Sequence, residues 1–304
     1  NIYILDLEME VDSTALLEAK PIYYRPVSFQ KPGNEVAVRL YFFDAKARYL
    51  IPVTRYIKKT PSILQETINE LIKGPSRRSE LSRIIPKDAT IEVSLHEGVA
   101  YLDLPEELNR LANSSQAAAA LRSLLLTSSQ FSTVDSICFL VEGRRVEHFC
   151  SDEITINENF PAHAPGSKRP VLYFPSRSGS RYYLLVQDGK EINYPLKDDE
   201  DLLKALFQKG KSFFPEGLSV LGIELYSNKM IVNLSEEFMK IFPVDGTEED
   251  KARAAVILDA IFLTIAENFG QDTISLLVKG LRIQPEGYPL LEREITRPFY
   301  INPE

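Results

Sequence analysis

The sequence has no tryptophan, and only two cysteines and three histidines occur among its 304 residues. A structural zinc site normally needs four Cys or His ligands. Such a site would have to bring together His96, His148 and His163, which are far apart in the chain. We therefore expect no metal site, and no motif indicates a cofactor.

Cys138 lies in the apolar run "SICFLV", which is typical of a core strand. It is expected to be a small buried hydrophobic residue with Cys150 as a free neighbour. A disulfide that closes a short loop is the alternative, and the sequence leaves both possibilities open.

Long hydrophobic runs are also absent. No stretch of about 18 apolar residues occurs, which a membrane-spanning helix would need. The opening "NIYIL" is followed too soon by acids to be an intact signal peptide. We expect any membrane contact to depend on an anchoring segment outside these residues.

The net charge of −8 is spread evenly along the chain. Residues 1–160 carry 18 Lys and Arg against 22 Asp and Glu, and residues 161–304 carry 17 against 21. There is thus no basic arm or acidic tail. Because binding to phosphate backbones needs a positive face, we expect no nucleic-acid partner.

The clearest positive feature is an internal repeat of about 130 residues. Each copy reads as a hairpin, a helix, a second hairpin, a long helix and a final strand followed by a basic turn. The matching segments are 38–53 and 170–186, 60–74 and 198–210, 89–104 and 218–234, 114–131 and 247–270, and 134–147 and 273–284.

Tight turns between strands imply antiparallel pairing, and two amphipathic helices per copy can cover one sheet face. We therefore predict the α+β class, with two tandem two-layer sandwiches, each a mostly antiparallel sheet covered by two helices. The expected divisions are an extended segment 1–36, a first domain 37–150, a linker 151–169 and a divergent second domain 170–304.

The first copy resembles the GerM domain. The similarity rests on "LYF" in the first strand, "LIKGP" at a helix end, "GVAYLDL" in the second hairpin and "FLVEGRRV" in the last strand. The second copy departs from this pattern, with Asn228-Lys229-Met230 in place of Gly98-Val99 and Asn233 in place of Asp103.

The resemblance implies an exported bacterial envelope protein, often a lipoprotein or otherwise membrane-anchored, with a role in sporulation or germination. It also implies a fold similar to modules that pack side by side in ring-shaped assemblies. No catalytic residues are attributed to the family, so none can be assigned to this chain.

Three carboxylates, Asp103, Glu106 and Glu107, lie close together in "VAYLDLPEEL". Paired carboxylates can act as acid and base. The equivalent "MIVNLSEEFM" has Asn233 in place of Asp103, and an amide accepts hydrogen bonds but cannot take part in acid–base catalysis. We therefore interpret Asp103 as a structural acceptor at a strand end, and we assign no catalytic residue.

Arg144 and Arg145, in a hairpin turn, are our first candidates for binding an anionic partner, because guanidinium groups suit carboxylates and phosphates. The basic segment 76–83 is a second candidate. The segment "SRSGSR" (176–181) has glycine and serine but falls in a hairpin turn and lacks a following helix, so it does not fit a phosphate-binding loop.

Three functions remain open. The first is a non-enzymatic envelope protein that binds a protein partner or copies of itself through exposed sheet edges. The second is a module that binds an envelope glycan such as peptidoglycan, which a groove with clustered Tyr and Arg side chains would support. The third is an unrecognised hydrolase.

Overall fold

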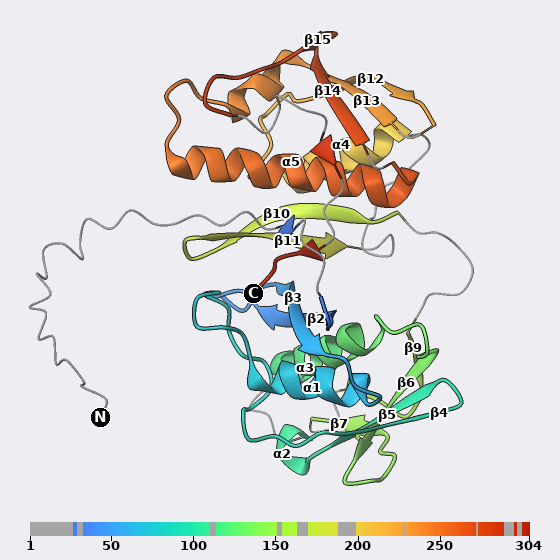
Figure 1. Ribbon diagram of the computed structural model, residues 1–304. Helices are drawn as coiled ribbons and strands as arrows, with labels where there is room; N and C mark the ends of the chain where they lie inside the picture. Colours follow the sequence, from blue (N-terminus) through green and yellow to red (C-terminus); the bar gives the residue numbers. More distant parts are fainter. Residues whose placement is uncertain are drawn as a thin grey trace, which may run out of the picture.

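A computed structural model describes residues 27–28, 33–109, 114–150, 154–162, 170–187, 199–227, 229–271, 273–288, 295–296 and 300–304. They form two similar α+β units, so the expected class is confirmed. We call residues 33–162 the first unit and residues 170–288 the second unit. Figure 1 shows one unit above the other, with the C-terminal end of the chain between them.

Both units follow the order that the repeat predicts. The first contains β2 (Glu35–Phe43), β3 (Leu50–Lys58), α1 (Ile63–Lys73), β4 (Glu92–His96), β5 (Val99–Leu104), α2 (Glu106–Asn109), α3 (Ser114–Ser128), β6 (Ser136–Val141), β7 (His148–Phe149), β8 (Ile154–Thr155) and β9 (Phe160–Pro161). The second contains β10 (Leu172–Ser178), β11 (Arg181–Gln187), α4 (Asp199–Lys209), β12 (Val220–Leu225), β13 (Lys229–Leu234), the 3-10 helix η2 (Glu236–Ile241), α5 (Glu248–Phe269), β14 (Thr273–Val278) and β15 (Leu281–Arg282).

Three further short strands complete the described chain: β1 (Val27–Ser28), β16 (Ile295–Thr296) and β17 (Tyr300–Ile301). Strand β16 pairs with β14 in the second unit, whereas β1 and β17 pair with each other.

The main sheet of each unit is antiparallel except at its centre. The strand order is β4-β5-β6-β9 in the first unit and β12-β13-β14-β15 in the second. The hairpins β4–β5 and β12–β13 are antiparallel, but β5 runs parallel to β6 and β13 parallel to β14. Parallel neighbours need a long crossover connection, and the helices α3 and α5 lie in these connections.

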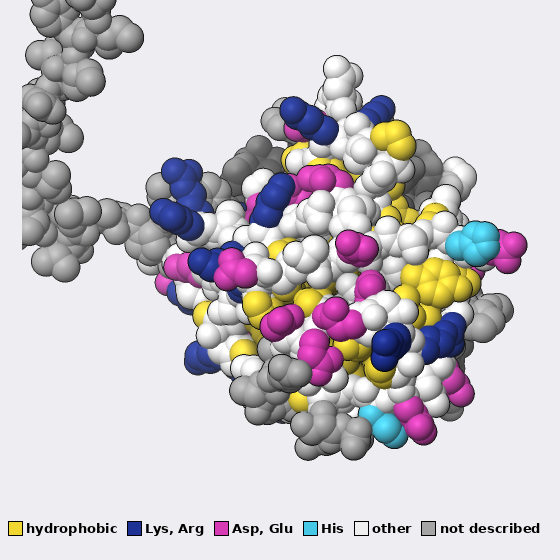
Figure 2. All heavy atoms as spheres, turned by 90° about the horizontal axis from the view of Figure 1, so that it is seen from below, with side chains coloured by type: hydrophobic (Ala, Val, Ile, Leu, Met, Phe, Trp, Pro, Cys, Tyr) yellow, Lys and Arg dark blue, Asp and Glu magenta, His cyan; other side chains and the backbone are white. Residues whose placement is uncertain are grey.

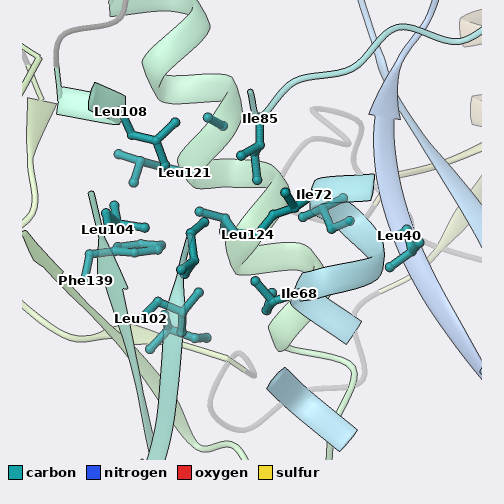
Figure 3. Close-up of a cluster of buried hydrophobic side chains, with 14 of the residues drawn as sticks. Leu40, Ile68, Ile72, Ile85, Leu102, Leu104, Leu108, Leu121, Leu124 and Phe139 are labelled. Atoms are coloured by element: carbon teal, nitrogen blue, oxygen red, sulfur yellow. The ribbon is translucent and has the colours of Figure 1, made fainter. Parts of the chain in front are cut away.

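The first hairpin of each unit is not part of the main sheet. Strands β2–β3 and β10–β11 form separate two-stranded sheets. Figure 3 shows Leu40 of β2 on one side of the core and Leu102, Leu104 and Phe139 of the main sheet on the other, with the helices between. Each unit therefore has three layers (hairpin, helices and sheet), one more than the two layers that we expected.

Helix α5 shows why the third layer forms. Every residue from Ala254 to Ala266 is buried, which means that the helix is apolar on all sides. Thr247 begins the helix with a capping box, in which its side chain and that of Asp250 bond each other's backbone N–H. Such a helix can be buried only if other elements cover it on both sides. The main sheet covers one side of α5, and the hairpin β10–β11 covers the other.

The two cysteines are free thiols and both are buried, in agreement with the first of the two alternatives. Burial raises the pKa of the Cys138 thiol.

The expected domain boundaries stay predictions. The described part of the segment 151–169 contributes β8 and β9, which pair with β7 and β6 of the first unit. In the segment 1–36, residues 27–28 form β1. Residues 33–34 precede β2, and residues 35–36 are the first two residues of β2. Residues 1–26, 29–32, 151–153 and 163–169 lie outside the described residues.

Candidate functional site

Asp103 and Asn233 make the same hydrogen bond in the two units. Asp103 Oδ1 accepts from the backbone N–H of Gly143, and Asn233 Oδ1 accepts from that of Gly280, each at 2.8 Å. Both glycines have a positive φ, of 74° and 79°, in the turn that follows the last long strand. The interpretation of Asp103 as a structural acceptor is thus confirmed.

The neighbouring glutamates begin a short helix, as the sequence predicts. Glu106 and Glu107 lie in the first turn of α2, and the backbone N–H of Glu106 donates to Glu142 Oε1 at 3.0 Å. In the second unit, Lys279 takes the place of Glu142 and forms an ion pair with Glu236. The described residues contain no group of three or more His, Cys, Asp or Glu side chains that could hold a metal ion.

The exchange of Asp103 for asparagine should therefore be nearly silent. We expect Asp103→Asn to change the free energy of unfolding by less than about 0.5 kcal/mol, since the amide oxygen keeps the bond to Gly143. Asp103→Ala should cost about 1 kcal/mol, as should Asn233→Ala. Urea unfolding checks all three, and a loss above about 2 kcal/mol for Asp103→Asn would show that the charge matters.

Arg144 and Arg145 have different bonding partners. The Arg145 guanidinium donates to the backbone oxygen of Asn157 at 3.2 Å and to Asn159 Oδ1 at 2.7 Å, so it holds the loop before β9. Arg144 exchanges two backbone hydrogen bonds with Val141, and it is exposed. Their role in binding an anionic partner stays a prediction. Figure 2 views the molecule from below, where acidic side chains gather near the middle of the face.

The other two basic segments, 76–83 and 176–181, bind each other across the two units. Ser178 Oγ donates to the backbone oxygen of Glu80 at 2.7 Å, and the Ser180 N–H donates to Glu80 Oε2 at 2.6 Å. Gly179 has a φ of +57°, and a Cβ there would collide with the Glu80 carboxylate. The glycine in "SRSGSR" is therefore required by this close approach between the units.

Hairpin β10–β11 is buried on both faces. Tyr182 and Leu184 pack on the α5 side, whereas Tyr183 belongs to the core of the first unit and donates its hydroxyl hydrogen to the backbone oxygen of Ser79. Burial raises the pKa of Tyr183.

The C-terminal residues lie between the two hairpins. Asn302 is 2% exposed, and its amide donates to the backbone oxygens of Pro52 at 2.6 Å and Leu184 at 2.8 Å. Its Oδ1 accepts from the Leu184 N–H at 2.9 Å, and its backbone oxygen accepts from Thr54. One side chain thus connects β3 of the first unit with β11 of the second.

Beside this junction is a groove of about 970 Å³, which we call the Arg-Tyr groove. It lies between the β2–β3 hairpin, residues 82–84, helix α3 and the end of β11. Its lining residues are Tyr41, Phe43, Ala47, Arg48, Tyr49, Leu50, Ser82, Arg83, Ile84, Ser115, Gln116, Ala118, Ala119, Arg122, Leu126, Leu185, Val186 and Gln187.

Asp44 organises the hairpin turn at the edge of this groove. Its Oδ1 accepts from the backbone N–H groups of Arg48, at 2.5 Å, and Tyr49, at 3.0 Å, and Oδ2 pairs with the Arg48 guanidinium at 3.2 Å. Burial of this carboxyl favours a higher pKa, but the hydrogen bonds from Tyr49 and Arg48 outweigh it and lower the pKa below its ordinary value of 3.8.

The lowered pKa predicts how Asp44 contributes to stability. Because the folded pKa lies below the unfolded one, the contribution is complete above the unfolded pKa and is lost as the pH falls through the folded pKa. Asp44→Asn should cost about 1–2 kcal/mol between about pH 5 and 7, with a difference from the wild type that shrinks below about pH 4. Urea unfolding along a pH series checks this, and a difference that grows on acidification would contradict it.

Sequence reasoning found few of the residues of the junction and the groove. The basic segment 76–83, our second candidate for binding an anionic partner, supplies Ser82 and Arg83 to the groove and Glu80 to the junction. Asn302 belongs to a segment that has no counterpart in the first copy, so the repeat gave no partner for it. Tyr41, Tyr49 and Arg48 were assigned only to a hairpin, because the residues opposite them come from α3 and β11. The one available signal was the aromatic run "PFYI" just before Asn302, which is typical of a buried segment.

A family model described as "Germane: Sporulation and spore germination" matches residues 39–147 and 171–284. Among solved structures, the tandem GerMN domains of the sporulation protein GerM from Bacillus subtilis are 16% identical, with a TM-score of 0.60; the match covers 88% of this chain and 99% of that one. The first GerMN domain of the same protein is 21% identical with a TM-score of 0.38, over 41% of this chain and 97% of that one.

No curated protein matches this sequence. Among the described residues, no helix combines the length and the hydropathy that crossing a membrane would require.

Proposed function

This chain belongs to the Germane family of sporulation and spore germination proteins, and we propose that it is a non-enzymatic protein of the bacterial cell envelope that works through protein–protein contacts. Its two units would form one body that presents sheet edges to a partner or to further copies of the chain. An anchoring segment outside the 304 residues would hold this body at the membrane.

One observation carries the proposal: both main sheets end in an edge strand with exposed apolar side chains. Strand β4 is the first strand of its sheet and β12 the first strand of the other. Leu95 on β4 is 47% exposed, and Leu221 and Leu225 on β12 are 51% and 50% exposed. Apolar residues of this size on an open edge are a liability unless another chain covers them.

The backbone of an edge strand supplies the binding groups. Its outward N–H and C=O groups can pair with an added strand of a partner, and alternate side chains give specificity. On β4 the Val93 N–H already donates to Gln65 Oε1, so the end of this strand near Leu95 is the part proposed to take a partner. Because β4 and β12 are equivalent strands of the repeat, the same kind of contact is available twice per chain. A two-site body of this kind can join two partners or extend an assembly of identical chains.

Edge-blocking substitutions test this proposal in cells. A charge on an edge strand opposes strand addition, so Leu95→Lys and Leu225→Lys should fail to restore sporulation or germination in a deletion strain of the host. Val244→Lys is the matched control, since Val244 is 87% exposed but lies outside any strand. Thermal unfolding should show that all three variants fold.

Full function of both edge variants, or equal loss in the Val244→Lys control, would contradict the proposal.

The same deletion strain distinguishes the proposed binding protein from a hydrolase. A catalytic role of the acids predicts that Asp103→Asn abolishes function in a folded protein, whereas a structural role predicts that function is kept.

A further inference from the structure

The Arg-Tyr groove is electropositive in an acidic protein. Three arginines line it, Arg48, Arg83 and Arg122, and none of its lining residues is an Asp or Glu, although the chain carries a net charge of −8. Ser115 and Gln116, in the first turn of α3, also line the groove. The N-terminal end of a helix carries a partial positive charge, which adds to that of the arginines. The groove therefore suits an anionic ligand.

Two of the arginines are held in place by the protein itself. Asp44, which is buried, pairs with Arg48, so the net positive charge of the groove comes from Arg83 and Arg122. The guanidinium of Arg83 donates to the last carbonyls of α1, those of Ile72 and Lys73. Groups fixed before binding lose less entropy when a ligand arrives, so this arrangement favours recognition of carboxylates.

Aromatic and neutral polar side chains complete the lining. Tyr41 and Phe43 are half-buried, and Tyr49 is 47% exposed, with the Arg48 guanidinium 5.3 Å from its ring centroid. Aromatic rings offer flat apolar faces at low entropic cost, and amides and hydroxyls fix orientation. Gln116, Gln187, Ser82 and Ser115 supply these polar groups.

The backbone along the groove is not open to an added peptide strand. On the outer edge of β2, the N–H and C=O of Arg39 both bond the Gln130 side chain, and those of Phe43 both bond Ser82. The carbonyl of Tyr41 accepts from Ser123 Oγ. An extended peptide binds chiefly through such backbone groups. A ligand that binds only to the side chains of the groove is therefore favoured here over an extended peptide.

We propose that the Arg-Tyr groove binds a glycan strand with carboxylate-bearing peptide stems, the chemistry of the bacterial wall polymer peptidoglycan. The arginines would bind its carboxylates, the aromatic rings would pack on its sugar faces, and the amides and hydroxyls would bind its hydroxyl and acetamido groups. This goes beyond the proposed protein contacts and uses another surface, and it shares with them only the envelope location.

Binding to purified wall material tests the proposal, with the intact chain as the probe. The protein should sediment with insoluble peptidoglycan sacculi and bind a labelled, soluble disaccharide-peptide fragment in fluorescence polarisation. Arg122→Gln and Tyr49→Ala should each weaken binding to the fragment about tenfold, and binding should weaken as salt is added.

Two matched controls lie outside the groove. Arg282→Gln removes one exposed positive charge, and Tyr226→Ala removes a tyrosine that is 54% exposed. Each should change the affinity less than about twofold. No retention of the intact chain on sacculi would overturn the assignment. So would equal losses in groove and control variants, or full competition by an acidic peptide of the same charge.

Discussion

Replacing Arg55 with methionine should lower the free energy of unfolding by about 3–5 kcal/mol. The Arg55 side chain is 16% exposed, and its guanidinium pairs with Glu70 at 3.0 Å and with Glu304, whose side chains are 15% and 4% exposed. It also donates to the backbone oxygen of Gly74 at 2.9 Å. Without Arg55, the buried Glu304 carboxylate would lose its ion-pair partner and Glu70 would keep only the exposed Lys73, and removing one partner is the costly way to break a buried ion pair.

The neighbouring Lys73 is the matched control. It pairs with the same Glu70 but is 60% exposed, so Lys73→Met should cost less than about 0.5 kcal/mol. Adding Glu304→Gln to Arg55→Met should restore part of the loss, because one unpaired charge is removed. Urea unfolding of the four proteins gives these values. Similar small losses for Arg55→Met and Lys73→Met would show that the network is solvated.

Asn302→Gly should cost about 3 kcal/mol and separate the two units before either unfolds. The substitution leaves the carbonyls of Pro52 and Leu184 and the N–H of Leu184 without the amide that now satisfies them. Glycine is chosen because Asn302 has a φ of +46°, which glycine adopts without strain.

Limited proteolysis and urea unfolding with a probe in each unit would follow this change. The wild type should show one transition and Asn302→Gly two. The control Asn159→Gly removes an exposed asparagine that accepts from Arg145, and it should keep the single transition. Coincident transitions in Asn302→Gly would contradict the role given to the asparagine.

Local features of the fold could be predicted from the sequence, because they depend on residues that are close together in the chain. The turn at Glu97-Gly98 has positive φ at both residues, 48° and 78°, which the glycine indicates and the glutamate does not. The role of Asp103 followed from comparison with Asn233, since a position that accepts an amide needs an acceptor and not an acid.

Layering and the junction were harder to predict because they depend on distant residues. The β2–β3 and β10–β11 hairpins look alike whether they join the main sheet or form their own layer. The sequence of α5 did indicate a covering layer on each side of this helix. Its run "AAVILDAIFLTIA" has no polar stripe that could face solvent. The position of Asn302 between Pro52 and Leu184 had no such sign, because its partners are backbone groups.

A distance measurement between the two units tests the central claim most directly, that the tandem units form one fixed body. Spin labels at Lys87→Cys and Glu216→Cys, exposed residues of the first and second units, would report that distance by pulsed electron paramagnetic resonance. The buried Cys138 and Cys150 should stay unlabelled. One narrow distance distribution, broadened by Asn302→Gly, is the predicted result. A broad distribution in the otherwise unaltered chain would contradict the account.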